Sequence, residues 1–309
     1  MASPAPARHL LDVADFTAAE LTAMLDLAEA PIAELGRPLD GMTPAALRRA
    51  RRDLSIVFQD PLASLDPAMS IGDSVAEPLR VAEPGLSREE RRRRVRETLS
   101  RVGLEEGFVN RYPHELSGGQ NQRVGIARAV VTRPKVLVCD EAVSALDVSV
   151  QAQVLVLLAE LQRELGLAML FISHDLSVVR QVSHRVLVMY LGAVVELATC
   201  EALFADPRHP YTRALLSAVP VPDPRVERGR ERIRLGGSAA RPTEPAARLR
   251  FLPSRLDAVS AGREGTASSS GGSADGTPPA MPALIEVAPG HLVAEHDPLE
   301  SLLVAPPGR

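Results

Sequence analysis

Two hydrophobic patterns alternate along the middle of the chain. Short continuous apolar runs occupy residues 54–58, 136–139 and 168–172. Runs of this length without polar alternation are typical of buried parallel strands. Apolar residues recur at helical spacing at 124–130 and 150–166. Strands that alternate with amphipathic helices predict an α/β fold with a parallel sheet.

Local end signals refine this pattern. A Ser or Thr followed three residues later by Glu predicts capping boxes at Thr17/Glu20 and at Ser87/Glu90. In contrast, residues 61–86 contain four prolines and are predicted to be irregular, since proline interrupts helices and strands.

The second half of the chain continues with shorter elements. We expect a helix at 177–182, a strand at 185–190 that continues into a hairpin arm at 191–198, a helix that begins at 208–212, and a last strand within 283–293. Residues 253–282 are rich in Ser, Gly, Ala and Pro, a composition that predicts disorder.

Composition excludes several classes of protein. The chain has 309 residues, is 45% hydrophobic and carries a formal net charge of -4, which gives no support to nucleic-acid binding. Its two cysteines, Cys139 and Cys200, exclude a disulfide framework and a four-cysteine metal site within one chain. No signal peptide is expected, and no apolar run reaches the roughly 18 residues that a membrane span needs. The basic run Arg91–Arg94 is interpreted as a solvated helix face.

The stretch Leu116–Gln120, LSGGQ, predicts a phosphate-binding helix start. Ser117, Gly118 and Gly119 would place a hydroxyl and unhindered backbone N–H groups at the positive end of a helix, where anions bind. Without further motifs, an ordinary helix cap would explain the same residues.

Polar side chains follow each of the three apolar runs. Gln59 follows the first, Asp140 and Glu141 end the second, and His174 follows the third. Open α/β sheets bind ligands at the carboxyl ends of their strands, so we expect Glu141 and His174 to meet at one edge. Asp140 suits a Mg²⁺ ligand, Glu141 suits activation of a water molecule, and Gln59 could reach a metal or water. A Gln in this place is otherwise usually a solvated loop residue.

These motifs, taken in order, resemble the ATP-binding subunit of an ABC transporter. FQDPLASLDP, LSGGQ, VLVCDEAVSALD and FISHD carry the likeness over residues 36–220. EALFADPRHPYTRALLSAVP and PALIEVAPGHLVAEH resemble the oligopeptide/dipeptide (nickel) importer branch and its extension, residues 221–309. The resemblance implies a truncated P-loop NTPase-type ABC ATPase domain, with a parallel sheet core and a helical subdomain.

The resemblance also implies roles for individual residues. Glu141 and His174 would be catalytic, as the Walker B glutamate and the switch histidine. The nucleotide would be contacted by Gln59 of the Q-loop, by the signature Leu116, Ser117, Gly118, Gly119 and Gln120, by Asp140, and by Asp147 of the D-loop. Asp140 and Gln59 would be the metal ligands.

Cofactors and partners follow from the same resemblance. ATP and Mg²⁺ would bind between two ABC ATPase subunits, either a homodimer or a heterodimer. Transmembrane permease subunits would contact residues 60–79 and hold the protein peripherally at the cytoplasmic face of the plasma membrane.

Three departures from the family change this expectation. Lys135 is the only lysine, so the chain contains no phosphate loop of the form G-x-x-x-x-G-K-[ST] (Walker A). Its own ATP site is therefore expected to be crippled, with ATP and Mg²⁺ held mainly by a partner. The extension lacks the cysteines of its family framework, so no iron–sulfur cluster is expected. A smaller departure is Asn121, where the family usually has a basic residue. Residues 1–35 are expected to form an atypical helical segment, and residues 8–35 within it resemble the first helix of ornithine and aspartate carbamoyltransferases. The alternative function is a non-catalytic docking or regulatory subunit, or an inactive decayed fragment.

Overall fold

The computed structural model describes residues 43, 52–219, 225, 232–235, 251 and 283–298. The chain forms two compact units, Met1–His174 and Asp175–Arg309, and each is considered by itself. The N-terminal segment 1–35, with its Thr17/Glu20 capping box and its carbamoyltransferase-like residues 8–35, and the low-complexity segment 253–282 lie outside the described residues. Among the described helices, none combines the length and hydropathy needed to cross a bilayer.

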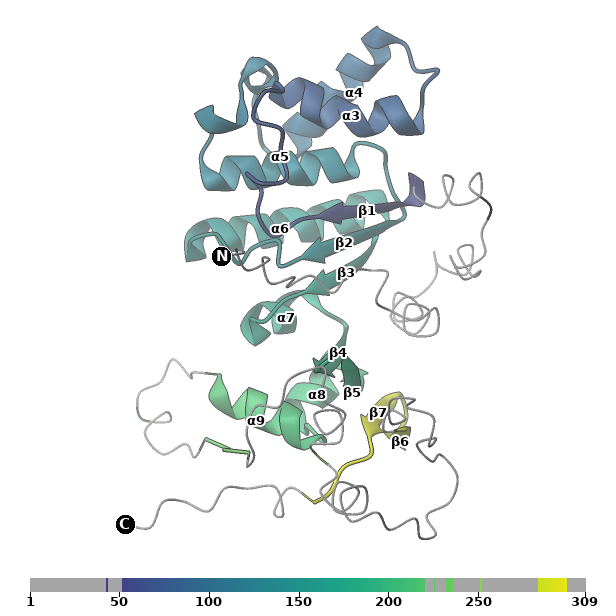
Figure 1. Cartoon of the computed structure of the whole chain (residues 1–309), viewed down its shortest axis with the longest axis vertical. Coiled ribbons are helices and arrows are strands. Elements are labelled where there is room, and N and C mark those ends of the chain that lie inside the picture. Colours follow the sequence, from purple (N-terminus) through teal and green to yellow (C-terminus); the bar gives the residue numbers. More distant parts are fainter. Residues whose placement is uncertain are drawn as a thin grey trace, which may run out of the picture. The chain divides into compact units, whose positions relative to one another are not determined.

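A parallel sheet forms the centre of the first unit (Figure 1). Its strands are β1 (Leu54–Val57), β2 (Val136–Asp140) and β3 (Ala168–Ile172), in the order β1-β2-β3. All three apolar runs are thereby confirmed as parallel strands. In the central strand β2, the four residues before Asp140 are buried, which explains why its sequence is apolar without alternation.

Two long helices accompany this sheet, α5 (Gly118–Val130) and α6 (Val148–Leu165). The apolar face predicted for α6 is buried through residues such as Leu157, Leu158 and Leu161. Gly166 ends α6 with φ 64°, the left-handed conformation that glycine adopts without steric cost.

A helical region lies between β1 and β2 in the sequence. It contains α3 (Ile71–Ala82), α4 (Arg88–Arg101) and two 3₁₀ turns at Glu106–Asn110 and Pro113–Glu115. The expectation of an irregular segment over 61–86 is confirmed for the turns at 61–70 and the residues 83–86, but it was wrong for 71–82, which form α3. Ser70 caps α3 by accepting a hydrogen bond from the Asp73 N–H at 3.2 Å.

Burial explains why α3 tolerates an internal proline. Pro78 removes one helical hydrogen bond, at a cost of about 3 kcal/mol. Ile71, Val75 and Leu79 recur at a spacing of four residues and are all fully buried. Each such side chain stabilises the fold by about 1.5–3 kcal/mol, so together they outweigh the proline.

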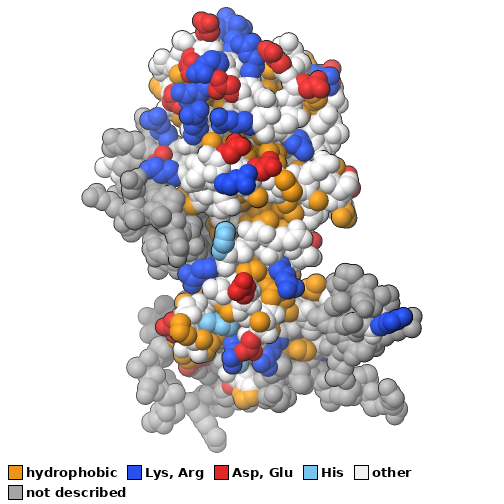
Figure 2. Space-filling view, turned by 180° about the vertical axis from the view of Figure 1, so that it is seen from behind, with side chains coloured by type: hydrophobic (Ala, Val, Ile, Leu, Met, Phe, Trp, Pro, Cys, Tyr) orange, Lys and Arg blue, Asp and Glu red, His pale blue; other side chains and the backbone are white. Residues whose placement is uncertain are grey.

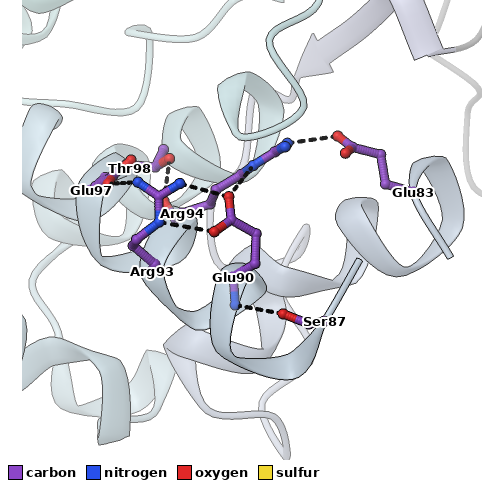
Figure 3. A network of polar contacts seen from close by, with 7 residues as sticks. All are labelled: Glu83, Ser87, Glu90, Arg93, Arg94, Glu97 and Thr98. Carbon is purple, nitrogen blue, oxygen red and sulfur yellow. Dashed lines mark hydrogen bonds and ion pairs between the residues drawn. The ribbon is translucent and has the colours of Figure 1, made fainter. Parts of the chain in front are cut away.

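The predicted capping box of α4 is only half formed (Figure 3). The Ser87 hydroxyl accepts from the Glu90 N–H at 3.1 Å, as predicted. The Glu90 carboxylate turns instead to Arg93, at 2.7 Å, and to Arg94, at 3.5 Å. Arg94 also pairs with Glu83 at 2.7 Å and so joins α4 to the end of α3. Figure 2 shows basic and acidic side chains intermixed over this region, and within the arginine run Arg93 and Arg94 pair with carboxylates.

The second unit is built on an antiparallel sheet in the order β4-β5-β7-β6. Its elements are α7 (Leu176–Val182), β4 (Arg185–Tyr190), β5 (Ala193–Thr199), α8 (Cys200–Ala205), α9 (Pro210–Ala218), β6 (Leu284–Ala288) and β7 (His291–Ala294). The hairpin of β4 and β5 and the start of α9 are confirmed. The predicted single strand within 283–293 is instead a second hairpin, which turns at Gly290 with φ 69°.

A buried carboxylate joins several elements of this unit. Glu196 in β5 has no exposed surface, and its oxygens accept the N–H groups of Arg208 at 2.8 Å and His209 at 3.0 Å. They also contact Nε2 of His291 in β7 at 2.7 Å. A buried charge is tolerated only when it is hydrogen-bonded in this way. Glu196 thereby fixes the start of α9 and the strand β7 against β5.

The first prediction tests the unexpected helix α3. Replacing the fully buried Leu79 by Ala should lower the free energy of unfolding by about 2–5 kcal/mol, because it leaves a cavity. The control Val81→Ala, at a position that is 82% exposed on the same helix, should change it by less than about 0.5 kcal/mol. Urea unfolding followed by circular dichroism measures both values. Equal small effects would mean that Leu79 is not packed in a core.

The second prediction concerns pH. Burial, with a smaller contribution from His296, lowers the pKa of His209 to about 3. Below pH 6.5, the usual pKa of histidine, His209 binds a proton in the unfolded chain but not in the folded chain. The free energy of unfolding should therefore fall as the pH falls toward 3. Between pH 7 and pH 5 the loss is about 2 kcal/mol. His209→Asn keeps an acceptor for the helix cap, and its urea unfolding should lack this part of the pH dependence. An unchanged pH dependence in the variant would contradict the assignment.

Candidate functional site

Three polar side chains meet at the carboxylate of Glu141. The Gln59 amide donates from Nε2 to one oxygen at 2.7 Å, and Nδ1 of His174 lies 2.9 Å from the other. An ionised carboxylate can only accept, so His174 carries its proton on Nδ1 in this contact. Each residue lies one or two positions after the end of one of three adjacent parallel strands, and the expected meeting of Glu141 and His174 at one edge is confirmed.

The backbone of Glu141 is held in an unusual conformation. Its φ is 44°, in the left-handed region that costs a residue with a side chain about 1–2 kcal/mol. Its N–H donates to the carbonyl of Ile172 at 3.0 Å, and its carbonyl accepts the Ser144 N–H at 3.0 Å. These bonds fix the turn after β2 and aim the Glu141 side chain at the end of β3.

Asp140 lies beside this cluster and is electrostatically disfavoured as an anion. Burial first, and then the charge of Glu141, raise the pKa of Asp140. A cation near Asp140 would relieve both effects. No group of three or more His, Cys, Asp or Glu side chains within the described residues is arranged to hold a metal ion alone. Mg²⁺ bound with a nucleotide needs only one or two protein ligands besides phosphates and water, so Asp140 with Gln59 fits that partial role.

The signature segment forms the capped start of α5. The Ser117 hydroxyl accepts from the Gln120 N–H at 3.3 Å, and the Gln120 side chain accepts from the Ser117 N–H at 2.9 Å. Leu116 is half-buried before the cap, and Gly118 is exposed. The reciprocal cap leaves the N–H groups of Gly118 and Gly119 directed out of the helix start, where an anion can accept them.

Asp147 caps the neighbouring helix. Its Oδ1 accepts from the Val150 N–H at 3.0 Å and from the Ser149 hydroxyl at 2.7 Å, and these bonds lower the pKa of Asp147. A Cβ added to Gly119 would lie 2.5 Å from Cγ1 of Val150. The signature and the D-loop are therefore in direct contact at the starts of α5 and α6.

No hydrogen bond among the described residues connects the signature, Leu116–Gln120, with the strand-end cluster of Gln59, Glu141 and His174. Among the described residues, the hydrogen bonds of Ser117 and Gln120 stay within the signature, and those of Gln59 and His174 go to Glu141.

Two polar residues of α5 shape these loops; Asn121 was noted from the sequence only as a departure from the family, and Arg128 was not noted. Asn121 is fully buried in α5, and its amide donates to the carbonyl of Pro113 at 3.0 Å, which holds the loop before the signature. Arg128 reaches from α5 to the carbonyl of Ser64 at 2.5 Å and holds the turn after Gln59. The helix has polar residues at 120–123 and at 128, so the sequence pattern alone does not mark which of them are buried.

The third prediction is that alanine substitutions at the two glycines of the signature have different effects on stability. Gly119→Ala should lower the free energy of unfolding by about 1–3 kcal/mol, because its methyl group would overlap Val150. Gly118→Ala is the matched control, since nothing lies within 4 Å of an added Cβ there. It should be neutral or stabilising by up to about 1 kcal/mol, because Ala is the better helix former. If urea unfolding gives the same change for both variants, α5 and α6 do not meet at Gly119.

Comparison with known proteins agrees with this arrangement. Residues 21–144 match the family described as ABC transporter, and residues 195–255 match the family described as oligopeptide/dipeptide transporter, C-terminal region. The oligopeptide transport ATP-binding protein OppF of Escherichia coli is 55% identical over 214 residues, which cover 69% of this chain and 64% of that protein. OppF of Haemophilus influenzae is 49% identical over 222 residues, 72% of this chain and 67% of that protein.

A related transport protein also matches. The glutathione import ATP-binding protein GsiA of Pectobacterium atrosepticum is 53% identical over 216 residues, 69% of this chain and 34% of that protein. The chain thus spans about two thirds of the length of the oligopeptide relatives and one third of GsiA. With the strand-end cluster, the capped signature and the C-terminal match, it belongs to the family of ABC transporter ATP-binding proteins of the oligopeptide/dipeptide importer type.

Proposed function

We propose that this chain is an ATP-binding subunit of a peptide-importing ABC transporter that acts mainly on ATP held by a second subunit. The observation that carries the proposal is the capped start of α5. Ser117 fixes the helix end, and the two glycines leave backbone N–H groups free of side chains. Such a surface suits the terminal phosphates of a nucleotide bound to another subunit.

The chain's own nucleotide site is crippled in this proposal. Lys135 precedes β2, and its Nζ lies 3.7 Å from Asp53, whereas Glu141 follows the other end of the strand. The only lysine is therefore unsuited to bind a phosphate beside Glu141. Each lost lysine or backbone contact costs about 1–3 kcal/mol, so ATP binding should weaken by several orders of magnitude.

The remaining residues take the roles that their contacts support. Glu141 would orient and deprotonate the attacking water. His174 and Gln59 hold the carboxylate of Glu141 in place. Asp140 and Gln59 would face Mg²⁺, which supplies charge neutralisation to the phosphates when bound. Asp147 would position the signature through the contact between Val150 and Gly119.

The proposed partners are a second ABC ATPase subunit and two transmembrane permease subunits. Residues 60–79 would face the permeases, and this segment includes Leu62, which is 54% exposed. The chain would then lie at the cytoplasmic face of the plasma membrane, peripherally, and would couple ATP turnover to peptide uptake. No iron–sulfur cluster is proposed, because Cys139 and Cys200 are the only cysteines.

A second function is favoured by one observation, the missing G-x-x-x-x-G-K-[ST] motif. The chain would then be a non-catalytic docking or regulatory subunit, or an inactive fragment. The two proposals differ in whether Ser117 contributes to ATP turnover by a partner.

The fourth prediction tests that difference. An intact oligopeptide ATP-binding relative is inactivated at its own signature and then mixed with this chain. We expect ATPase activity to rise at least about tenfold, and Ser117→Arg to abolish the rise, since the arginine would fill the phosphate position. Ser87→Arg is the matched control, because it also removes a helix-capping serine but lies at the start of α4.

Three results would contradict the proposal. No rise with the wild-type chain would favour the non-catalytic function. Equal activity of the Ser117 and Ser87 variants would remove the signature from the mechanism. Micromolar ATP binding by this chain alone would show that its own site is not crippled.

A further inference from the structure

Residues 60–65 form a compact turn directly after Gln59. Oδ1 of Asp60 accepts two backbone N–H groups of the turn, at 2.9 Å and 3.1 Å, and the Asp60 carbonyl accepts the Ser64 N–H at 3.1 Å. An Asp side chain that bonds the backbone two or three residues later stabilises a turn of this kind. These bonds hold the turn together as one unit, so a displacement of Ser64 is passed on to the adjacent Gln59.

Arg128 connects this turn to the signature helix α5. Its Nη1 donates to the Ser64 carbonyl at 2.5 Å, across 64 positions of the sequence. Within the part of the chain that the structure describes, no other side chain from a different element forms a hydrogen bond with residues 60–65. Hydrogen bonds from a charged donor are shorter and stronger than neutral ones, so the turn is held to α5 through this contact.

A simpler role for Arg128 does not explain this geometry. The residue lies in the last turn of α5, where a cation stabilises the helix C-terminus. A guanidinium that served only this purpose could stay in water or bind the last carbonyl groups of its own helix. Instead, burial lowers the pKa of Arg128, and the charge of Glu77 opposes this effect only in part. The charged group is desolvated where it reaches Ser64, which indicates that the contact itself is required.

The same contact links the two groups of site residues, which share no direct hydrogen bond. At one end of the turn, the amide of Gln59 donates to Glu141 at 2.7 Å. At the other end the turn is bonded to Arg128, and Ser117 lies at the start of the same helix, about 16 Å away along the axis at 1.5 Å per residue. A shift of α5 along or across its axis therefore reaches Gln59 through the turn.

We propose that Arg128 is a positioning residue that couples the turn 60–65, and with it Gln59, to the signature helix α5. An anion drawn to the N–H groups of the signature would displace α5 as a body, and the turn would follow. Coupling between two sites is reciprocal, so a partner that moves the turn would change anion binding at the signature. This inference rests on the proposed function, since it adds a regulation of the signature by the turn.

The test uses the full chain alone and displaces α5 without a ligand. Gly119→Ala places a Cβ 2.5 Å from Cγ1 of Val150 and should push α5 away from α6. Hydrogen exchange of the Ser64 and Leu65 amides, which bond within the turn, should become at least about threefold faster. Gly118→Ala is the matched control, because nothing lies within 4 Å of its added Cβ, and it should leave both rates unchanged.

Substitution of Arg128 shows whether this residue carries the effect. In an Arg128→Met background, Gly119→Ala should no longer accelerate exchange in the turn. Arg123→Met is the matched background, because Arg123 also donates from α5 to a backbone carbonyl, that of Val102 at 2.6 Å. There the response of the turn to Gly119→Ala should remain.

Three outcomes would overturn the inference. They are exchange in the turn that does not respond to Gly119→Ala, the same response in the Arg128→Met background, and loss of the response in the Arg123→Met background as well. Exchange through global unfolding would respond alike in every background and so gives the second outcome. The signature test with Ser117→Arg measures ATP turnover by a partner. Activity there without coupling here would leave the proposed function intact and reject this inference alone.

Discussion

The parallel alignment of β1, β2 and β3 is the constraint on which the rest of the first unit depends. Parallel strands bring their carboxyl ends to one edge, and each of these three is followed or ended by a polar side chain. Gln59 and His174, which are far apart in sequence, thereby lie 2.7 Å and 2.9 Å from the two carboxylate oxygens of Glu141. The left-handed turn at Glu141 adds the final orientation, at a cost that the bonds to Ile172 and Ser144 offset.

The capped N-termini of α5 and α6 are the second feature on which the site depends. Ser117 and Asp147 each cap a helix, and the missing side chain at Gly119 lets these two starts approach through Val150. The same glycine therefore serves packing and exposes backbone N–H groups. This double use explains why the signature can be a phosphate surface without any charged side chain of its own.

The charged side chains of this chain differ in how they are compensated by their neighbours. The basic residues of α4 pair with acidic neighbours such as Glu90, and the buried Glu196 of the second unit is satisfied by backbone N–H groups and a histidine. The strand-end cluster has two adjacent carboxylates, Asp140 and Glu141, and burial first and then the charge of Glu141 raise the pKa of Asp140.

The sequence by itself determined the features set by neighbouring residues. The three apolar runs and the helix start at Ser117 depend on local pattern and backbone preference, and all were predicted. Tertiary structure decided the rest. The helix α3 forms despite Pro78 because Ile71 and Leu79 are buried in a core, and Arg94 of α4 pairs with Glu83 at the end of α3. The burial of Glu196 and the pairing of β7 with β5 join segments about 95 residues apart, and no local pattern specifies a contact over that separation.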